Sequence, residues 1–332
     1  MTPSQPTSSS ASRVRIGLVG AGMMGTLHAR VISESLRCEL TWICDRNETS
    51  GRNAAARFTT RWVPEMEFNS VDAVIIASST ETHPALALAA IDAGKALLVE
   101  KPLADTLADT MQIVDSAAAG DIPLMCGFLE RFNPVIRTAM EFVEAPVHAA
   151  AARHSPYVTR IRTGVASDLL IHDLDALIRL FGTRPTLQRG QLGEVHPDSD
   201  PGSEDIAEAI LDFGAGRLAT ASASRVAQRK VRTLVITELD RQIELDLLRQ
   251  DITIYRHVEH AASDDRTGLG YRQQTVIDIP VLRFQREPLA AQLDEFLDVV
   301  AGDHDLTAVR ESLLEPHLAL GALRASITSA ES

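Results

Sequence analysis

Three side chains of this 332-residue chain could act together on an alcohol. Lys101 lies two residues after the predicted strand 95–99 and so at the carboxyl end of a parallel strand, where ligands bind in doubly wound sheets. Asp168 and His172 are four residues apart, so on a helix they share one face. An ammonium can lower the pKa of a hydroxyl, and an imidazole can take its proton while a hydride leaves. The set predicts alcohol oxidation, with Asp168 orienting either the substrate hydroxyl or the imidazole.

Each of these residues also has a simpler explanation. A lysine after a strand is often a surface residue, and an aspartate in the first turn of a helix often complements the helix dipole. A histidine among leucines, as in the segment 167–181, is often a hydrogen-bonded core residue. The catalytic interpretation therefore requires a cofactor site elsewhere in the chain.

The N-terminal segment supplies a candidate cofactor site. Residues 14–19 form an apolar run typical of a buried strand, and a glycine-rich turn with the pattern G-x-G-x-x-G follows it. Gly20 permits the tight turn, Gly22 lets the backbone approach a pyrophosphate, and Gly25 lets the next helix pack closely. Met23 and Met24 complete the turn. The free N–H groups at the start of that helix favour phosphate binding.

Asp45 strengthens this interpretation. It ends a second predicted strand, 39–44, and lies 20 residues after Gly25 (45 minus 25), where a carboxylate that binds ribose is expected. Its carboxylate oxygens would accept hydrogen bonds from a ribose 2′-hydroxyl. Its negative charge would repel a 2′-phosphate, which favours NAD over NADP. Arg46 follows directly and could offset part of that repulsion.

The elements that must position these residues form two parts. Strand and helix patterns alternate through residue 128, with apolar runs at 71–77, 95–99 and 122–127, which predicts an N-terminal doubly wound parallel Rossmann sheet of the α/β class over 13–128. The segment 59–70 allows only a brief strand.

The pattern changes after residue 128. A helix is expected at 167–181, and two more close the chain at 288–300 and 308–328. Between them, six runs are typical of strands in a mostly antiparallel sheet: 186–195, 205–213, 217–225, 231–238, 242–247 and 252–257. Residues 129–332 therefore form a predicted α+β domain with an open sheet, whose uncovered face favours a homodimer or homotetramer. The stretches 198–205 and 260–270 are expected to be loops without an evident role.

Composition narrows the possible partners and location. The chain has 32 basic and 45 acidic residues and a net charge of −13, which argues against nucleic acid as a partner. No apolar run is long enough to span a membrane. Three cysteines without a C-x-x-C pair indicate core residues of a reducing compartment, and no set of side chains has metal-ligand spacing. Residues 1–12 are expected to be a disordered tail, so the protein is predicted to be cytoplasmic.

Taken in order along the chain, these motifs resemble the Gfo/Idh/MocA family, named for glucose–fructose oxidoreductase and inositol dehydrogenase. The resemblance rests on the glycine turn, Asp45, the link 78–83, the tripeptide 100–102 and the Asp168/His172 pair. It implies NAD(P)-dependent oxidation or reduction of a sugar or polyol. It also implies Lys101, Asp168 and His172 as the active trio, with further residues lining the nicotinamide side, namely Ser78, His83 and Glu100.

Three segments, 130–134, 153–157 and 168–175, are similar to the branch of that family that oxidises the 3-hydroxyl of UDP-N-acetylglucosamine. Arginine forks suit a diphosphate, so the substrate-binding candidates include Arg131, Arg153 and Arg160, together with Asn133. A solvated, charged loop would explain the same arginines.

Three hypotheses follow. The first is an NAD-dependent dehydrogenase of a nucleotide-activated amino sugar. The second is an NADP(H)-dependent ketoreductase or dehydrogenase of free sugars, inositols or small diols. The third is a dinucleotide-binding sensor or scaffold without turnover.

Overall fold

The N-terminal part of the chain is the predicted doubly wound sheet. The computed structural model describes residues 13–159, 161–261 and 271–328. Six parallel strands lie in the order β3-β2-β1-β4-β5-β6. Their bounds are β1 (Val14–Val19), β2 (Cys38–Cys44), β3 (Arg61–Val63), β4 (Ala73–Ile76), β5 (Ala96–Val99) and β6 (Leu124–Cys126). The brief third strand is the one expected from the segment 59–70.

Four helices cover this sheet, and the chain enters each as the sequence suggests. They are α1 (Met23–Glu34), α2 (Glu48–Arg57), α3 (His83–Asp92) and α4 (Leu107–Ala119). Asn47 and Thr106 cap α2 and α4 through their side-chain oxygens, while Pro84 lies in the first turn of α3. Strands β4, β5 and β6 are buried throughout, and all three cysteines are buried and form no disulfide.

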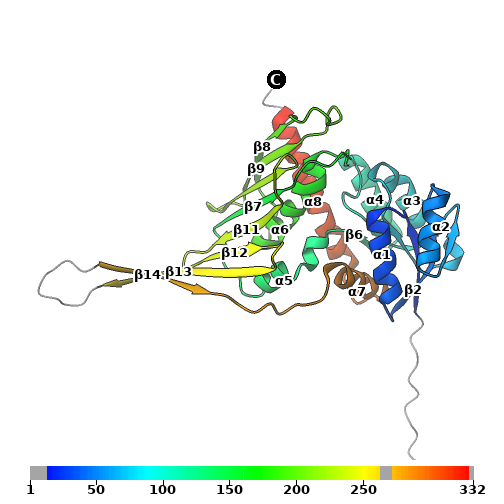
Figure 1. The fold of residues 1–332 in the computed structure, drawn as a ribbon, viewed down its shortest axis with the longest axis horizontal. Coiled ribbons are helices and arrows are strands. Elements are labelled where there is room, and N and C mark those ends of the chain that lie inside the picture. The colour runs from blue at the N-terminus through cyan, green and yellow to red at the C-terminus, as the bar shows by residue number, and fades with distance from the viewer. Residues whose placement is uncertain (1–12, 160, 262–270, 329–332) are drawn as a thin grey trace, which may run out of the picture.

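The second sheet is larger than predicted. Its eight strands lie in the order β14-β13-β12-β11-β7-β10-β9-β8, and every pairing is antiparallel except β7 with β10. The expected strands are β8 (Leu187–Gly193), β9 (Ile206–Asp212), β10 (Leu218–Ser224), β11 (Val231–Thr237), β12 (Gln242–Asp246) and β13 (Asp251–Ala261). The last of these is longer than its prediction, and with β14 it forms an arm beyond the rest of the sheet (Figure 1).

Two strands were absent from the prediction. They are β7 (His148–His154) and β14 (Tyr271–Asp278). The sequence of β7 is mostly alanine, which has little intrinsic preference for strands, so its pairing with β10 and β11 must supply the stability that its own residues lack. The pattern of residues in the sequence therefore does not predict this central strand of the sheet.

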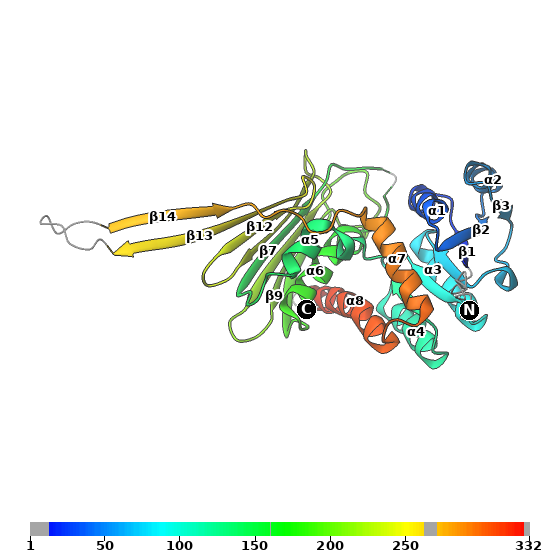
Figure 2. The same cartoon turned by 90° about the horizontal axis from the view of Figure 1, so that it is seen from below.

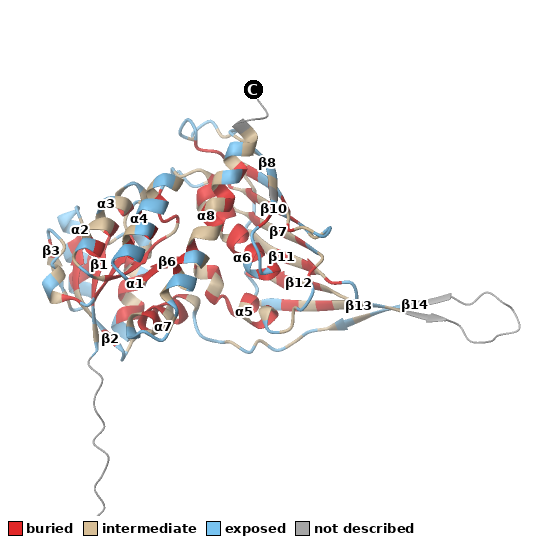
Figure 3. Cartoon of the chain, turned by 180° about the vertical axis from the view of Figure 1, so that it is seen from behind, coloured by how far each residue is buried: buried red, intermediate tan, exposed pale blue. Residues whose placement is uncertain are grey.

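Helices cover one face of this sheet and connect it to the Rossmann domain (Figures 2 and 3). Short segments η3 (Leu129–Phe132) and α5 (Pro134–Met140) lead into the domain, and α6 (Ile171–Phe181) packs on the sheet. The long helix α8 (Leu306–Thr328) contacts α6 and β8 on one side and α4 and β6 on the other. Its neighbour α7 (Pro288–Ala301) packs against α1, so its apolar side joins the core of the Rossmann domain.

Some expectations lie outside the described residues. The tail 1–12 and Arg160 are among them, as is most of the expected loop 260–270. Within the described ranges, no helix combines the length and the apolar character that a membrane crossing requires.

A buried histidine of α8 holds the loop after β5. The His317 Nδ1–H donates to the Leu313 carbonyl at 2.7 Å, which leaves Nε2 to accept the Leu103 N–H at 3.0 Å. Burial lowers the pKa of His317 to about 4. Protonation of Nε2 would break the bond to Leu103, so the fold requires the neutral imidazole.

This arrangement predicts a loss of stability in mild acid. The pKa of His317 rises from about 4 in the folded chain to about 6.5 on unfolding, so the unfolded state binds more protons between those values. Stability is therefore retained above pH 6.5 and lost as the pH falls. Between pH 7.5 and 5, this group alone removes about 2 kcal/mol. The free energy of unfolding can be measured in urea at pH 7.5 and at pH 5. Between these two pH values His317→Gln should lose less of it than wild type, whereas His148→Gln should lose as much as wild type. Equal losses in all three proteins would contradict this role.

Candidate active site between the two domains

The turn between β1 and α1 has the geometry that a dinucleotide phosphate requires. Gly20 has a φ of +99°, and a Cβ on Gly25 would lie 1.9 Å from the Gly20 carbonyl oxygen. By contrast, a Cβ on Gly22 would meet no atom within 4 Å, so that face of the turn is open to a ligand. Gly22 also begins α1 without a side-chain cap. The first N–H groups of the helix therefore remain available to an anion.

Asp45 lies beside this turn at the end of β2. One carboxylate oxygen accepts the Ala21 N–H at 2.6 Å, and the other accepts the Asn47 N–H at 2.7 Å. Each oxygen has a further lone pair for a ribose hydroxyl. The exposed Arg46 follows it, while Met23 and Met24 lie in the first turn of α1. These residues fit the adenosine half of NAD.

The other predicted cofactor residues cross-link the ends of β4 and β5. The buried His83 bonds the Pro102 carbonyl at 3.0 Å and the Ser78 carbonyl at 3.2 Å. Glu100 is also buried and pairs with His28 of α1 at 2.8 Å. The peptide bond from Lys101 to Pro102 is cis. In this arrangement the side chains of His83 and Glu100 anchor the segment that presents Lys101.

Lys101 reaches across to the second domain. Its Nζ donates to the Asp168 carboxylate and to the Asp168 carbonyl, each at 2.7 Å. The side chains are 16% and 25% exposed, so the pair is only partly screened by water. The structure thus joins two residues that lie 67 positions apart in the sequence.

Asp168 lies in a π-helical turn, Ala166–Leu170, that leads into α6. The sequence predicted one regular helix from residue 167. The wider turn is held by Glu204, whose carboxylate accepts the Ala166 N–H at 3.0 Å and whose carbonyl accepts the Val165 N–H at 2.8 Å. Ser167 and Arg324 add a further bond at 2.9 Å. The start of the helix that carries Asp168 and His172 is therefore held by residues outside that helix.

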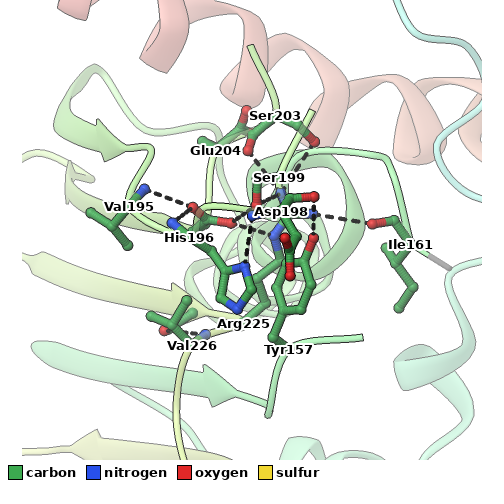
Figure 4. Close-up of polar contacts among 12 residues, drawn as sticks. Tyr157, Ile161, Val195, His196, Asp198, Ser199, Ser203, Glu204, Arg225 and Val226 are labelled. Carbon is green, nitrogen blue, oxygen red and sulfur yellow. Dashed lines mark hydrogen bonds and ion pairs between the residues drawn. The ribbon is translucent and has the colours of Figure 1, made fainter. Parts of the chain in front are cut away.

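The expected loop 198–205 has a role in this support (Figure 4). The buried Arg225 donates to the carboxylate of Asp205 at 2.7 Å and to the carbonyls of Ser203 and Thr163 at 2.8 and 3.0 Å. Burial would raise the pKa of Asp205, but its hydrogen bonds hold that pKa far below the usual range. Besides Arg225, the groups that donate to the Asp205 carboxylate are the Ser199 hydroxyl and the N–H groups of Val195 and His196. This network positions Glu204 against the π-helical turn.

His172 is the third member of the predicted trio. Its Nδ1 is buried and has no hydrogen-bond partner among the described residues. Asp168 is instead paired with Lys101, so the structure shows no bond between Asp168 and the imidazole. Burial lowers the pKa of His172 well below its usual range, and nearby positive charges lower it further, namely those of Lys101, Arg153 and Arg232. The imidazole is therefore neutral at ordinary pH, which is the form that accepts a proton.

The expectation that Arg153 contacts substrate needs correction. Its side chain is 2% exposed, and its guanidinium binds Asp173 at 2.8–3.1 Å and Glu130 at 2.7 Å. Burial would lower the pKa of Arg153, but the charges of these carboxylates raise it above the usual range. Arg153 lies on the unpredicted strand β7 and therefore faces α6. Its ion pair with Asp173 holds α6 against the sheet.

Two other substrate candidates also have partners within the protein. Arg131 binds the carboxylate of Asp175 at 2.7 Å and the carbonyl of Ser312 at 2.7 Å. Asn133 is buried, caps α5 and donates to Glu130 at 2.9 Å. Both residues support the framework of the site, and neither is free to bind a diphosphate in this conformation.

Sequence analysis missed Arg232. It lies on β11 directly opposite Arg153, and its nearest carboxylate oxygen belongs to Glu130 at 3.7 Å. The side chain is 34% exposed, yet its Nε is buried without a hydrogen-bond partner. Burial lowers the pKa of Arg232, and the Arg153 charge lowers it further. The sequence did contain a clue to Arg232. Side chains alternate along β11, so Arg232 is a charged residue on the same face as the apolar Leu234 and Ile236.

Comparisons with known proteins agree with this geometry. Residues 14–128 match the family model described as "Oxidoreductase family, NAD-binding Rossmann fold", and residues 112–241 match the Gfo/Idh/MocA C-terminal domain. The chain is 31% identical to inositol 2-dehydrogenase 2 of Paenarthrobacter aurescens over 62% of its own length and 67% of that protein.

A second relative is similar over almost its whole length. The UDP-N-acetylglucosamine 3-dehydrogenase of Acidithiobacillus ferrooxidans is 28% identical over 87% of this chain and 89% of that protein. Its solved structure superposes with a TM-score of 0.81 at 27% identity, and the match covers 96% of this chain and 99% of the other. These findings confirm the resemblance in sequence, fold and cofactor. The chain belongs to the Gfo/Idh/MocA family of oxidoreductases, and its N-terminal domain is the NAD-binding Rossmann domain of that family.

Proposed function

We propose that this oxidoreductase oxidises a secondary hydroxyl of a sugar, with His172 as the base that takes the hydroxyl proton. The observation that carries the proposal is the contact between Lys101 and Asp168 across the two domains, and the lowered pKa of His172, to which the Lys101 charge contributes, supports it. NAD, when bound, supplies the nicotinamide ring that accepts the hydride.

The residues of the trio have different tasks in this mechanism. The neutral His172 accepts the O–H proton as the carbon–hydrogen bond breaks and hydride leaves the same carbon. The Lys101 ammonium stabilises the negative charge that develops on the substrate oxygen. Asp168 holds the ammonium through two acceptors, its carboxylate and its carbonyl, so the cation is oriented before the substrate arrives.

The positive charges near His172 also lower the affinity of its imidazole for a proton. A protonated His172 would lie near the positive charges of Lys101 and Arg232, so the imidazolium formed in the reaction readily returns its proton to water or, in the reverse direction, to the substrate oxygen. The geometry therefore supports both oxidation and reduction.

We further propose a nucleotide-activated amino sugar, oxidised at its 3-hydroxyl, as the substrate. Similarity to the UDP-N-acetylglucosamine 3-dehydrogenase supports this choice. Arg232 supports it independently, because its side chain is 34% exposed and its charge acts on both Asp168 and His172, so its guanidinium can donate to a diphosphate near the trio. Arg232 takes the role that the sequence suggested for Arg153.

Inositols or free sugars are the second candidate substrates. The similarity to inositol 2-dehydrogenase 2 favours them. Such substrates carry no phosphate, so they give Arg232 no anionic partner. The two candidates therefore differ in their dependence on this arginine.

We also propose that the chain forms a homodimer or homotetramer through the open face of its C-terminal sheet. That face carries outward residues of the central strands, such as Thr220, Thr233 and Val235, together with the exposed Ile210 and Leu218. No helix of the described chain covers it (Figure 2). An open sheet commonly buries such a face against a second copy.

The trio predicts a separation of binding from catalysis. Lys101→Ala should lower kcat at least about a hundredfold, because the developing charge loses its cation. His172→Ala should lower it by about 10²–10⁴-fold, because the proton loses its acceptor. NAD should bind both variants with affinity close to wild type, measured by calorimetry.

Lys95→Ala is the matched control, since that lysine lies at the opposite end of β5, and its turnover should equal that of wild type. Full turnover by both active-site variants would overturn the mechanism.

Arg232→Gln tests the substrate class. With UDP-N-acetylglucosamine, kcat/KM should fall tenfold or more, as expected for loss of a charge-assisted hydrogen bond of about 1.5–3 kcal/mol. With myo-inositol, where activity is measurable, the change should stay below about threefold. The neighbouring, exposed Arg229→Gln should alter neither reaction. Equal losses with both substrates, or no loss with the nucleotide sugar, would refute the role of Arg232.

The oligomer is testable by sedimentation. Val235→Lys places a charge at the centre of the open face and should shift the protein toward a monomer. Leu239→Lys changes an exposed residue of the turn after β11 and should leave the mass unchanged. A wild-type protein that sediments as a monomer would exclude the proposal.

A further inference from the structure

A second polar cavity lies between the domains, away from the trio. It has a volume of about 330 Å³, at the small end of the range for ligand pockets. Its walls come from β6, η3, α5, α6, α7, α8 and the segment before α7. Arg179, on the last turn of α6, is seven residues after His172, which is about 10 Å along the helix. None of the three trio residues lines it.

The charges in this cavity are unbalanced. Three guanidiniums line it, from Arg131, Arg137 and Arg179, against one carboxylate from Glu295. Arg131 is neutralised by its pair with Asp175. Within the described ranges, neither Arg137 nor Arg179 has a carboxylate at ion-pair distance.

The two unpaired guanidiniums have different surroundings. Arg137 lies over the ring of Phe284 at 4.0 Å, a contact that orients its planar group. Arg179 is exposed overall; partial burial of its guanidinium and the positive charge of Arg131 lower its pKa, while the charges of Asp175 and Glu295 raise it. An anion bound by Arg137 and Arg179 would offset the repulsion from Arg131, since guanidiniums bind carboxylate and phosphate groups through paired hydrogen bonds. In a protein with a net charge of −13, such a local excess of positive charge is selective for anions.

The rest of the wall is apolar, which constrains the body of the ligand. The side chains that form it are Met125, Phe132, Ile136, Met140, Phe284, Val299, Val309 and Leu313. Free phosphate would leave this surface uncovered, whereas a compound with an apolar body and one anionic group would use both parts of the cavity.

We propose that this cavity binds a small organic anion, a carboxylate or phosphate monoester with an apolar body, at a site distinct from those for NAD and sugar. Arg137 and Arg179 bind the anionic group, and the apolar wall covers the body. Because β6 belongs to the Rossmann domain and α5 to the second domain, the ligand contacts both.

Calorimetry on the full-length protein tests this site, with saturating NAD present so that the glycine turn is not available to the probe. The probes are phenyl phosphate and phenylacetate, which differ in the anionic group, at ionic strength matched with sodium chloride. At least one should bind saturably with one site per chain. Arg179→Gln and Arg137→Gln should each weaken that binding about tenfold or more, as expected for loss of a charged hydrogen bond. The exposed Arg249→Gln should bind as wild type does.

Binding of one probe alone would support the site and identify the anionic group it prefers. The proposal is overturned if neither probe binds saturably up to about 20 mM, or if both cavity variants bind as tightly as wild type. Turnover of the sugar is not part of this measurement, so its outcome is independent of the proposed reaction.

Discussion

The site depends on one contact, in which the Lys101 ammonium of the first domain meets Asp168 of the second. A lysine at the end of a strand has four rotatable bonds, and alone it would sample many positions. Two acceptors on one residue, each 2.7 Å away, restrict the ammonium to a single direction. The contact therefore sets the position of the charge, and that charge adds to the effect of burial, which is the main reason that the pKa of His172 is lowered.

Both ends of this contact are held by buried polar groups. On the Rossmann side, three histidines with partners in the protein support the segment after β5: His28, His83 and His317. On the other side, Glu204 caps the π-helical turn, and Arg153 ties α6 to the sheet. Breaking a buried ion pair such as that of Arg153 with Asp173 typically costs about 3–5 kcal/mol, so α6 resists small displacements from the sheet.

The sequence was sufficient for the features that depend on local patterns. The glycine turn, Asp45 and the parallel strands follow from periodicity and backbone geometry, and Lys101 follows from its place after a strand. The partners of buried charges do not follow in this way. Arg153 looked like a substrate ligand because β7 is mostly alanine, which concealed the strand and hence the direction of the side chain. Glu204 acts across 38 residues on Ala166, a distance that no local pattern reports.

The most direct measurement is an NMR titration of His172 in protein labelled at histidine nitrogens, with His172→Gln used to assign the signal. The charge of Lys101 contributes to the lowered pKa of the imidazole, so wild-type His172 should titrate well below pH 6.5 and Lys101→Met should shift that titration to higher pH. A normal titration in wild type, or the same midpoint in both proteins, would show that the ammonium and the imidazole do not interact.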